Sequence, residues 1–492
     1  MSSVRRALAY SFAERYLLLV IGLGSNMAIA RMLTPEAIGI FSVSLAVIGI
    51  AQVMRDFGVA NYLIQERDLS DAHIRTAFGI TLVLGGSAFV ALFLAAPLIS
   101  RFYAEPAMVA TLRICAANFL ALPFCTVSLA LLRRELAFKR LAMINLLAAA
   151  VGAALSIGLA YLGHGVVSLA IGSVAVNVTT GAGAWWMRRG RRLLLPSFSE
   201  WRRLLNFGAQ STVAGVVTTV SMDINDLAVG KIMGFEPVAI LSRAQGLTNL
   251  FHRDLMSAVR NVAYPAFAQA NRDRTELEPV YVTSVAHVTV LAWPFYGFTS
   301  LYALEILRLL FGPQWDAAAP LVPVFCLAGA VAATSSLIAS LILAVGRVDL
   351  VTWVELVFQP FRAALIVIAA LVFKSTMACA IALVLALLVH LPLLYVVKGK
   401  CLPNDYLALS RRLSVSIAVT LAALIIPATI AIDAGLQRSQ TVAPLVFLSA
   451  AVSCALSWLL ALIVLRHPLT LDPAFVRLAK WCRRPRHAGF GA

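Results

Sequence analysis

Ionisable side chains within or beside long apolar runs are the residues of this sequence best suited to do chemistry. Five of them are arginines, namely Arg15, Arg55, Arg243, Arg253 and Arg260. A guanidinium group presents a planar fork of donors that pairs bidentately with phosphate oxygens. Because a charge inside a membrane is costly unless it is paired or hydrated, the set indicates a hydrated cavity that binds an anionic headgroup such as a diphosphate.

Three carboxylates in similar surroundings are suited to bind a coupling ion. Glu14 directly precedes Arg15, and Asp223 and Asp226 are three residues apart, so the two aspartates share one helix face. Binding of H⁺ or Na⁺ to any of them would favour one state of a transporter. Structural alternatives stay open, because Glu14 is also suited to pair with an arginine of a neighbouring helix, and the two aspartates to lie near the outer interface and cap Lys231.

The remaining ionisable groups in apolar runs can be explained by structural roles as well as by functional ones. Glu355 and Arg362 are seven residues apart, which places them on one helix face as a static ion pair. His287 and His390 are isolated in the sequence, as expected of buried neutral histidines. Arg253 and Arg260 are also explained as ordinary cytoplasmic charges.

Signatures of enzymes are absent from the sequence. It holds no GxxxxGK[ST], GxGxxG, HExxH or GxSxG motif. The seven cysteines are scattered without a CxxC pair, which excludes the usual zinc site and disulfide framework. We therefore expect no catalytic residue, no metal and no cofactor, apart from H⁺ or Na⁺ coupling.

Transmembrane helices are the elements that must position these residues. Hydrophobic residues make up 61% of the 492 and charged residues 13%, against about 45–50% and 25% in soluble domains. A crossing needs about 20 apolar residues. The sequence therefore predicts an all-α polytopic membrane protein with about 14 transmembrane helices. The runs are 8–32, 37–56, 76–99, 108–132, 141–162, 165–187, 205–233, 238–262, 280–311, 317–344, 350–373, 376–397, 412–432 and 442–465.

Positive charge is distributed unevenly among the connections. The chain carries a net charge of +17. The preference of positive residues for cytoplasmic loops of membrane proteins explains this charge better than binding to a nucleic acid does. With both termini in the cytoplasm, 30 of the 40 Lys and Arg residues fall in cytoplasmic segments and seven in outside loops. This bias follows the positive-inside rule, so we expect a multi-pass protein of the bacterial inner membrane with both termini cytoplasmic.

An internal repeat at an offset of 200 residues is indicated by two similar segments. Residues 28–42 read AIARMLTPEAIGIFS, and residues 228–242 read AVGKIMGFEPVAILS. A unit of six helices would make two parallel bundles related by an axis along the membrane normal, plus two extra C-terminal helices. We thus expect six-helix bundles at 1–200 and 201–400, two additional helices at 401–466 and a basic cytoplasmic tail at 467–492.

Three segments resemble those of a known transporter family. Residues 30–39 (ARMLTPEAIG), 55–65 (RDFGVANYLIQ) and 264–267 (YPAF) resemble segments of polysaccharide-exporting flippases of the Wzx type. The similarity is greatest to the branch with colanic-acid and succinoglycan exporters, in the multidrug/oligosaccharidyl-lipid/polysaccharide superfamily. The resemblance covers the N-terminal half well, but the C-terminal third only by its hydropathy. Phe57 stands where the family's segment usually has Leu, and this change is conservative.

The resemblance implies that the chain flips an undecaprenyl-diphosphate-linked oligosaccharide across the bacterial inner membrane for exopolysaccharide or O-antigen synthesis. It also implies diphosphate binding by Arg15 and Arg55, since related lipid II flippases use arginines on equivalent helices. The expected partners are this lipid, the bilayer, a polysaccharide polymerase and a chain-length regulator, with no nucleic acid. The rival interpretations are an ion-coupled multidrug antiporter, a membrane-embedded glycosyltransferase or polymerase, and a scaffold.

Overall fold

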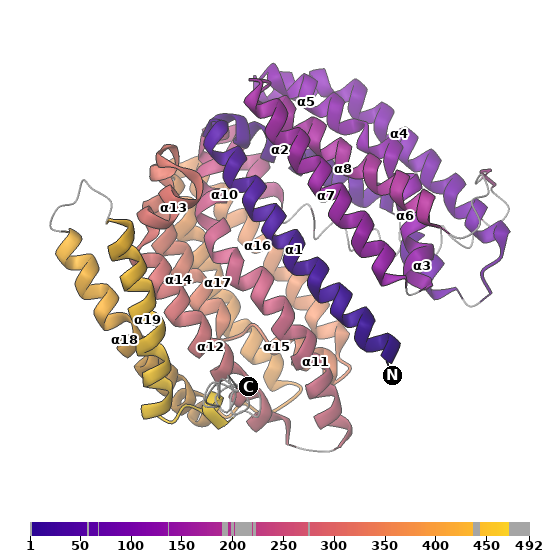
Figure 1. Ribbon diagram of the computed structural model, residues 1–492. Coiled ribbons are helices and arrows are strands. Elements are labelled where there is room, and N and C mark those ends of the chain that lie inside the picture. The colour runs from indigo at the N-terminus through magenta and orange to yellow at the C-terminus, as the bar shows by residue number, and fades with distance from the viewer. Residues whose placement is uncertain are drawn as a thin grey trace, which may run out of the picture. The chain divides into compact units, whose positions relative to one another are not determined.

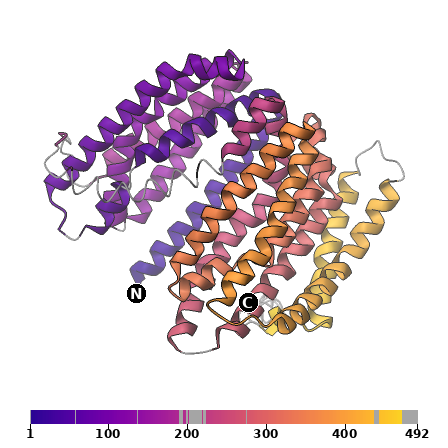
Figure 2. The same cartoon turned by 180° about the vertical axis from the view of Figure 1, so that it is seen from behind.

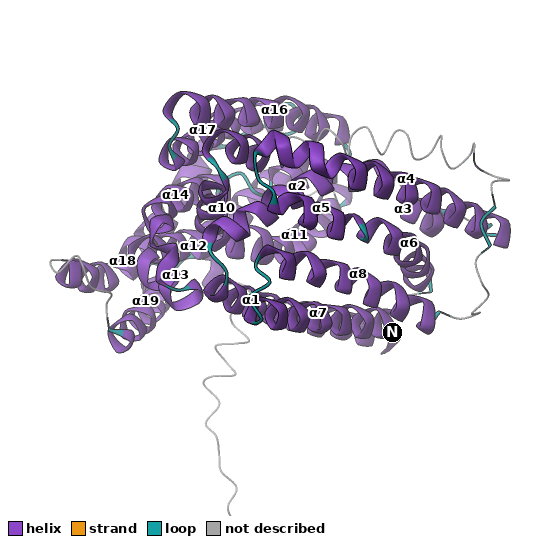
Figure 3. Ribbon diagram, turned by 90° about the horizontal axis from the view of Figure 1, so that it is seen from above, coloured by secondary structure: helices purple, strands orange, loops and turns teal. Residues whose placement is uncertain are grey.

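Helices make up the regular structure of the chain, and Figure 3 shows no strand in the part that the computed structural model describes. Ten of these helices are long and apolar enough to cross a membrane, or eleven with the bent pair α12 (Leu277–Leu301) and α13 (Ala303–Phe311). The predicted all-α polytopic class is therefore confirmed, while the count of fourteen stays a prediction. The described residues are 2–56, 59–66, 68–135, 137–188, 195–197, 201, 219, 223–273, 276–435 and 443–471.

The chain divides into two compact units, whose helices are labelled in Figure 1. The first comprises Met1–Ile240, Leu310–Gln314 and Val367–Ser375, and the second comprises the rest. Within the first unit, α7 packs against α1 and α8, and α6 packs against α4 and α8. Its labelled helices are α1 (Ser2–Met32), α2 (Pro35–Asp56), α3 (Val59–Gln65), α4 (Asp71–Tyr103), α5 (Ala107–Ala116), α6 (Asn118–Arg134), α7 (Phe138–Tyr161) and α8 (Val166–Met187).

The turn between α1 and α2 shows what the ARMLTPEAIG segment does locally. The Thr34 hydroxyl oxygen accepts a hydrogen bond from the backbone N–H of Ala37 at 3.3 Å, which caps α2. Pro35 takes the first helical position, where a missing N–H costs nothing. Glu36 follows in the first turn, where its charge complements the helix dipole. The segment thus specifies a sharp helix hairpin.

A second turn of similar design follows 200 residues later. Gly234 adopts a φ of 93°, which side-chain-bearing residues rarely adopt, and α10 (Phe235–Asn249) begins at the next residue. Glu236 and Pro237 lie in its first turn, as Glu36 and Pro35 do in α2. The two turns share one plan, which supports an internal repeat at this offset.

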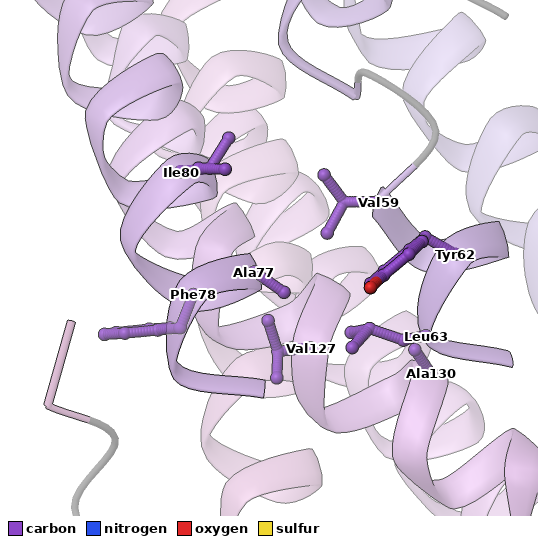
Figure 4. Packing of buried hydrophobic residues seen from close by; sticks show 8 residues of the cluster. All are labelled: Val59, Tyr62, Leu63, Ala77, Phe78, Ile80, Val127 and Ala130. Atoms are coloured by element: carbon purple, nitrogen blue, oxygen red, sulfur yellow. The ribbon is translucent and has the colours of Figure 1, made fainter. Parts of the chain in front are cut away.

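The RDFGVANYLIQ segment ends in a short helix, α3, that packs into the core of the first unit. Figure 4 shows the cluster around it. Arg134 of α6 donates from one guanidinium nitrogen to the backbone oxygen of Leu63 at 3.1 Å and also to that of Glu66. These bonds satisfy carbonyls that the short helix leaves without partners. The buried residues of the cluster are Val59, Tyr62, Leu63, Ala77, Phe78, Ile80, Val127 and Ala130.

The second unit consists of helices that pack side by side, with α12 in contact with α14 and α18, and α18 with α19 (Figures 1 and 2). Part of α10 belongs to it. Its other elements are the π-helical η1 (Leu250–Leu255), α11 (Met256–Arg272), α12, α13, the 3₁₀-helical η2 (Pro313–Leu321), α14 (Val322–Ala333), α15 (Ile338–Ala344), α16 (Val348–Phe373), α17 (Thr376–Gly399), α18 (Tyr406–Gly435), α19 (Pro444–Val464) and the 3₁₀-helical η3 (Pro468–Leu471).

The α18–α19 hairpin is joined to α12 by a buried polar network around His467. The Nε2 atom of His467 lies 3.2 Å from the hydroxyl of Ser416, and Thr289 of α12 donates to Ser416 at 3.1 Å. The Nδ1 atom of His467 accepts from the backbone N–H of Leu469 at 3.2 Å. His467 is fully buried, and its ring centre lies 6.3 Å from that of His287. The contacts suit a neutral imidazole.

We expect this network to make the protein acid-sensitive. Burial, together with His287 and Arg412, lowers the pKa of His467 from its ordinary value of 6.5 to about 4. As the pH falls, His467 of the unfolded chain therefore binds a proton before His467 of the folded chain does. The stabilisation that is fully present above pH 6.5 is then lost as the pH falls toward 4, and the free energy of unfolding decreases by at most about 1.4 kcal/mol per pH unit. Thermal unfolding of the purified protein at several pH values measures the loss. His467→Gln should reduce the acid-dependent loss, whereas the exposed His164→Gln should not; an equal acid effect in both variants would contradict the assignment.

Candidate functional site

An apolar groove lies between α10, α12 and α19 of the second unit. Its volume is about 440 Å³. Leu247 and Leu250 form one wall, Leu291 and Phe295 another, and Trp458 of α19 closes the third. The Trp458 indole N–H donates to the backbone oxygen of Val290 at 2.9 Å, so that its one polar group is satisfied. The groove is therefore suited to hold a hydrocarbon chain.

A second apolar groove lies between α2 and α4 of the first unit. It has a volume of about 520 Å³. Val47, Ile50 and Ala51 line it from α2, and Ala91 and Ala95 line it from α4. Small side chains dominate the α4 wall and leave room for an occupant on that side. Like the first, it suits a hydrocarbon chain.

The two grooves are lined by residues at equivalent positions of the sequence repeat. Val47 and Ile50 correspond at an offset of 200 to Leu247 and Leu250. Ala91 and Ala95 of α4 correspond likewise to Leu291 and Phe295 of α12, as the numbering shows. The offset found in one turn thus recurs among the residues of two groove walls. This agreement supports two copies of one helical plan.

Arginines follow the groove-lining residues along the same helices. Arg55 of α2 is four residues beyond Ala51, and Arg253 of η1 is three residues beyond Leu250. The side chains of both arginines lie outside the described part of the structure. Their backbone positions nevertheless place each within a turn of a groove wall.

Arg243 of α10 is fixed by an aromatic ring. It is 9% exposed, and its guanidinium carbon lies 4.6 Å from the centre of the Trp315 ring. A guanidinium over an aromatic face is attracted by the ring quadrupole and keeps its charge. Arg243 stands four residues before the groove residue Leu247 on the same helix. Arg260, on α11, is half-buried.

Glu14 and Arg15 occupy different environments although they are neighbours. The Asn145 amide of α7 donates to Glu14 Oε1 at 2.6 Å, whereas Arg15 is exposed. Glu14 thus joins α1 to α7, as the structural alternative for this residue supposed, with an asparagine in place of the expected arginine. The exposure of Arg15 is compatible with headgroup binding, which stays a prediction for this residue.

Asp223 and Asp226 lie on a helical stretch, residues 223–233, that packs against α2 in the first unit. A Cβ added to Gly49 would lie 2.7 Å from Asp223 Oδ2, and one added to Gly230 would lie 2.7 Å from a methyl group of Val43. Glycines therefore allow the two backbones to approach closely, as in other membrane helix pairs. Both aspartates are half-buried, which is compatible with ion binding.

One feature of the site has no local sequence signal, namely the π-helical turn η1. It covers Leu250–Leu255 and so contains a groove residue, Leu250, and the candidate Arg253. Such turns insert an extra residue into a helix and occur frequently at functional sites. Between Leu247 and Arg253 the helix therefore changes the direction in which successive side chains point.

Comparison with known proteins identifies relatives of the sequence. Residues 28–320 match the family of polysaccharide biosynthesis proteins. The lipopolysaccharide biosynthesis protein WzxC of Escherichia coli K12 is 24% identical over 376 residues, 75% of each chain. The succinoglycan biosynthesis transport protein ExoT of Rhizobium meliloti is 22% identical over 333 residues, 67% of each chain.

Solved structures share the fold. The lipid II flippase MurJ in an inward closed conformation matches with a TM-score of 0.73 and 13% identity, over 94% of this chain and 99% of that one. An inward-facing multidrug transporter of the MATE family matches with a TM-score of 0.61 and 16% identity, over 78% and 95%. The fold is thus that of MurJ and the MATE transporters. Since the matched family segment spans more than half of its residues, the chain belongs to the family of polysaccharide biosynthesis proteins.

Proposed function

We propose that the chain flips a polyprenyl-diphosphate-linked oligosaccharide from the cytoplasmic to the periplasmic leaflet of the bacterial inner membrane. The observation that carries this proposal is the recurrence of an apolar groove with an arginine within a turn of it on the same helix, Arg55 after Ala51 and Arg253 after Leu250. A polyprenyl diphosphate has the same two parts, a hydrocarbon tail and a doubly charged anion. The names of WzxC, ExoT and MurJ point to related cargo.

The two parts of the site solve two physical problems. Each CH₂ of the tail that water touched would cost about 0.8 kcal/mol, so the tail stays in a groove or in lipid. The diphosphate and sugar hydroxyls have no partners in hydrocarbon, and a hydrated region lined by arginines supplies them. Rocking of the two halves would then expose the headgroup to one side and afterwards to the other.

The orientation that we propose follows from the charge bias and places both termini in the cytoplasm. A reporter fused after Ala492 should then be active only in the cytoplasm, and one inserted at His164, between α7 and α8, only in the periplasm. Activity of alkaline phosphatase and of a cytoplasmic fluorescent protein distinguishes the two. A periplasmic C-terminus would mean that the number of crossings is odd.

The alternative function is that of a multidrug antiporter, because a MATE transporter has a similar fold. Cation exporters need carboxylates at the cargo site, whereas the groove walls described here are followed by arginines. We propose a transporter rather than an enzyme, with a polysaccharide polymerase and a chain-length regulator acting after it. Coupling to H⁺ or Na⁺ would give the net direction.

Flipping is tested with purified protein in vesicles that contain a polyprenyl diphosphate bearing one fluorescent sugar. A membrane-impermeant quencher reports the fraction of probe in the outer leaflet. Ala455→Trp fills the groove, and it should slow flipping by at least about tenfold, the effect of displacing roughly two methylenes at about 0.8 kcal/mol each. The neighbouring Leu456→Trp, outside the groove lining, is the matched control. Wild-type protein that moves no probe would refute the proposed function.

A further inference from the structure

Another groove lies at one end of the second unit, between the start of α12, the loop before α18 and the first two turns of α18. Its volume is about 760 Å³. Apolar side chains make up much of its lining, with Leu277 and Val282 on the α12 side and Leu407 and Ala408 on the α18 side. Leu407 is 62% exposed. An apolar lining that stays open to its surroundings is typical of a docking site.

Carboxylates border this groove where it opens. Glu276 and Asp405 belong to its lining, and both are exposed. Asp405 Oδ1 accepts from the backbone N–H of Ala408 at 2.8 Å, which caps α18. A third carboxylate of the lining, Glu278, is paired with Lys398. Glu276 and Asp405 are thus the two carboxylates at this opening that are exposed to an occupant.

Basic residues contribute less to the lining. Arg412 is the one basic residue among its described members, whereas Lys400 and Arg411 do not line the groove. Arg412 is seven residues beyond Asp405, which places it about 10 Å deeper along α18. The opening of the groove therefore carries a negative charge, and a positively charged occupant suits it.

The last described helix, η3, lies close to the same groove. It packs against α12, and His467, just before it, lies within hydrogen-bond distance of Ser416 of α18. Arg412 of the groove is four residues before Ser416, about 6 Å along the helix, and its charge acts on His467. Asp405 is eleven residues before Ser416, about 16 Å along the helix. Residues 472–492 thus continue from a point a few turns of helix away from the groove.

These residues match the groove in composition. Phe475 and Trp481 supply aromatic side chains for its apolar lining. The segment has a single acidic residue, Asp472, against five basic ones, which are Arg477, Lys480, Arg483, Arg484 and Arg486. Arginine pairs readily with carboxylates. Position 482 is eleven residues beyond η3, a span of about 36 Å for an extended chain and about 16 Å for a helix, so either reaches the groove.

Two other occupants suit the groove less well. The phosphate of an anionic lipid would meet the carboxylates Glu276 and Asp405 at its opening. The same segment of a second copy would compete with one that is already tethered nearby, and a short tether gives an effective concentration in the millimolar range. Charge and chain connection therefore both favour the segment of the same chain.

We propose that the basic segment 472–492 docks in this groove of its own chain, with its aromatic side chains on the apolar lining and its arginines against Glu276 and Asp405. The docked segment covers Leu407 and joins α12 to the start of α18. The inference goes beyond the proposed function and does not depend on it. It requires only that the groove and η3 lie at the same end of α18, as the contacts of His467 show.

Cross-linking of Leu407→Cys to the native Cys482 tests the contact in the full-length chain. Cys401→Ser removes the partly buried cysteine beside the groove, and the other described cysteines are buried. A membrane-permeant bismaleimide is added to the protein in vesicles that contain phosphatidylglycerol. A protease site inserted between α18 and α19 is then cut in detergent. A bridged chain stays in one piece on a denaturing gel, whereas an unbridged chain separates into two fragments.

The matched control is Asp433→Cys, an exposed position on the same helix. It lies 26 residues beyond Leu407, about 39 Å along α18. Bridging from position 407 should be at least about tenfold faster than bridging from position 433, because docking raises the local concentration of Cys482 near the groove alone.

Exchange of charges tests what holds the segment. Glu276→Lys with Asp405→Asn, which keeps a cap on α18, should slow bridging about threefold to tenfold, the effect of losing two exposed ion pairs. Arg483→Glu with Arg484→Glu should slow it similarly, and the two exchanges together should restore the rate. Each rate is divided by that of labelling with a monofunctional maleimide, which corrects for thiol reactivity. Thermal unfolding of every variant controls for folding.

Three results would overturn the docking. Equal rates from positions 407 and 433, or no bridge from position 407, would place the segment elsewhere, such as on the anionic membrane surface. Bridges that join two chains into a dimer would assign the groove to the segment of a second copy. Charge exchanges that fail to restore each other would show that Glu276 and Asp405 do not bind the arginines.

Discussion

Replacing both Arg15 and Arg55 by alanine should reduce polysaccharide export at least about a hundredfold, because we expect these two arginines to hold the diphosphate. Each charge-assisted hydrogen bond contributes roughly 1.5–3 kcal/mol, so two losses amount to roughly 3–6 kcal/mol. Arg15 is exposed on α1, so its replacement opens no packed core, and Arg55 follows the groove residue Ala51 along α2. Polymer is quantified in a deletion strain that carries the variant, with immunoblots of the membrane fraction.

The controls separate headgroup binding from general loss of charge. Arg15→Lys with Arg55→Lys should only weaken export, because lysine keeps the charge but not the bidentate fork. Alanine at Arg101 and Arg133, two exposed arginines of the same unit, removes equal charge without reducing export. Normal export by the variant with alanine at positions 15 and 55 would show that these arginines do not carry the diphosphate.

The helices were predictable because the membrane leaves few alternatives. A backbone in hydrocarbon must satisfy its own N–H and C=O groups, and a helix does so within one segment. The apolar run 141–162 thus became α7 (Phe138–Tyr161), and the run 165–187 became α8 (Val166–Met187). Charged and turn-forming residues at the ends of each run defined these boundaries.

Contacts between helices were less predictable, since they join residues far apart in the chain. Nothing near Glu14 indicates that its partner is Asn145, 131 residues away. Nor does the sequence show that Arg134 closes the short helix α3. The sequence indicated the candidate arginines by residue type alone. It could not show the grooves, because their walls also need α4 and α12, which are far away in the chain. The offset of 200 residues was the one long-range signal in the sequence.

A buried ion pair at one end of the second unit illustrates the same limit, because Lys398 looks like an ordinary loop charge in the sequence. In the structure it is fully buried, and its Nζ lies 2.5 Å from Glu278 Oε2. The ammonium also donates to the Asn404 side chain at 2.9 Å and lies 4.6 Å from the centre of the Tyr281 ring. Glu278 Oε1 accepts from the backbone N–H of Asp405 at 3.1 Å. The pair therefore ties α12 to α17 and to the start of α18.

Replacing Glu278 by leucine should lower the free energy of unfolding by about 3–5 kcal/mol, because it leaves the Lys398 charge buried without its partner. The double change Glu278→Leu with Lys398→Met should recover most of this loss, since two apolar side chains need no counter-charge. Asp349→Leu, which breaks the exposed pair with Arg347, is the matched control and should hardly change stability. Thermal unfolding in detergent compares the variants. A double variant as unstable as Glu278→Leu alone would show that the cost arises from lost packing or from the Asp405 contact rather than from an unpaired charge.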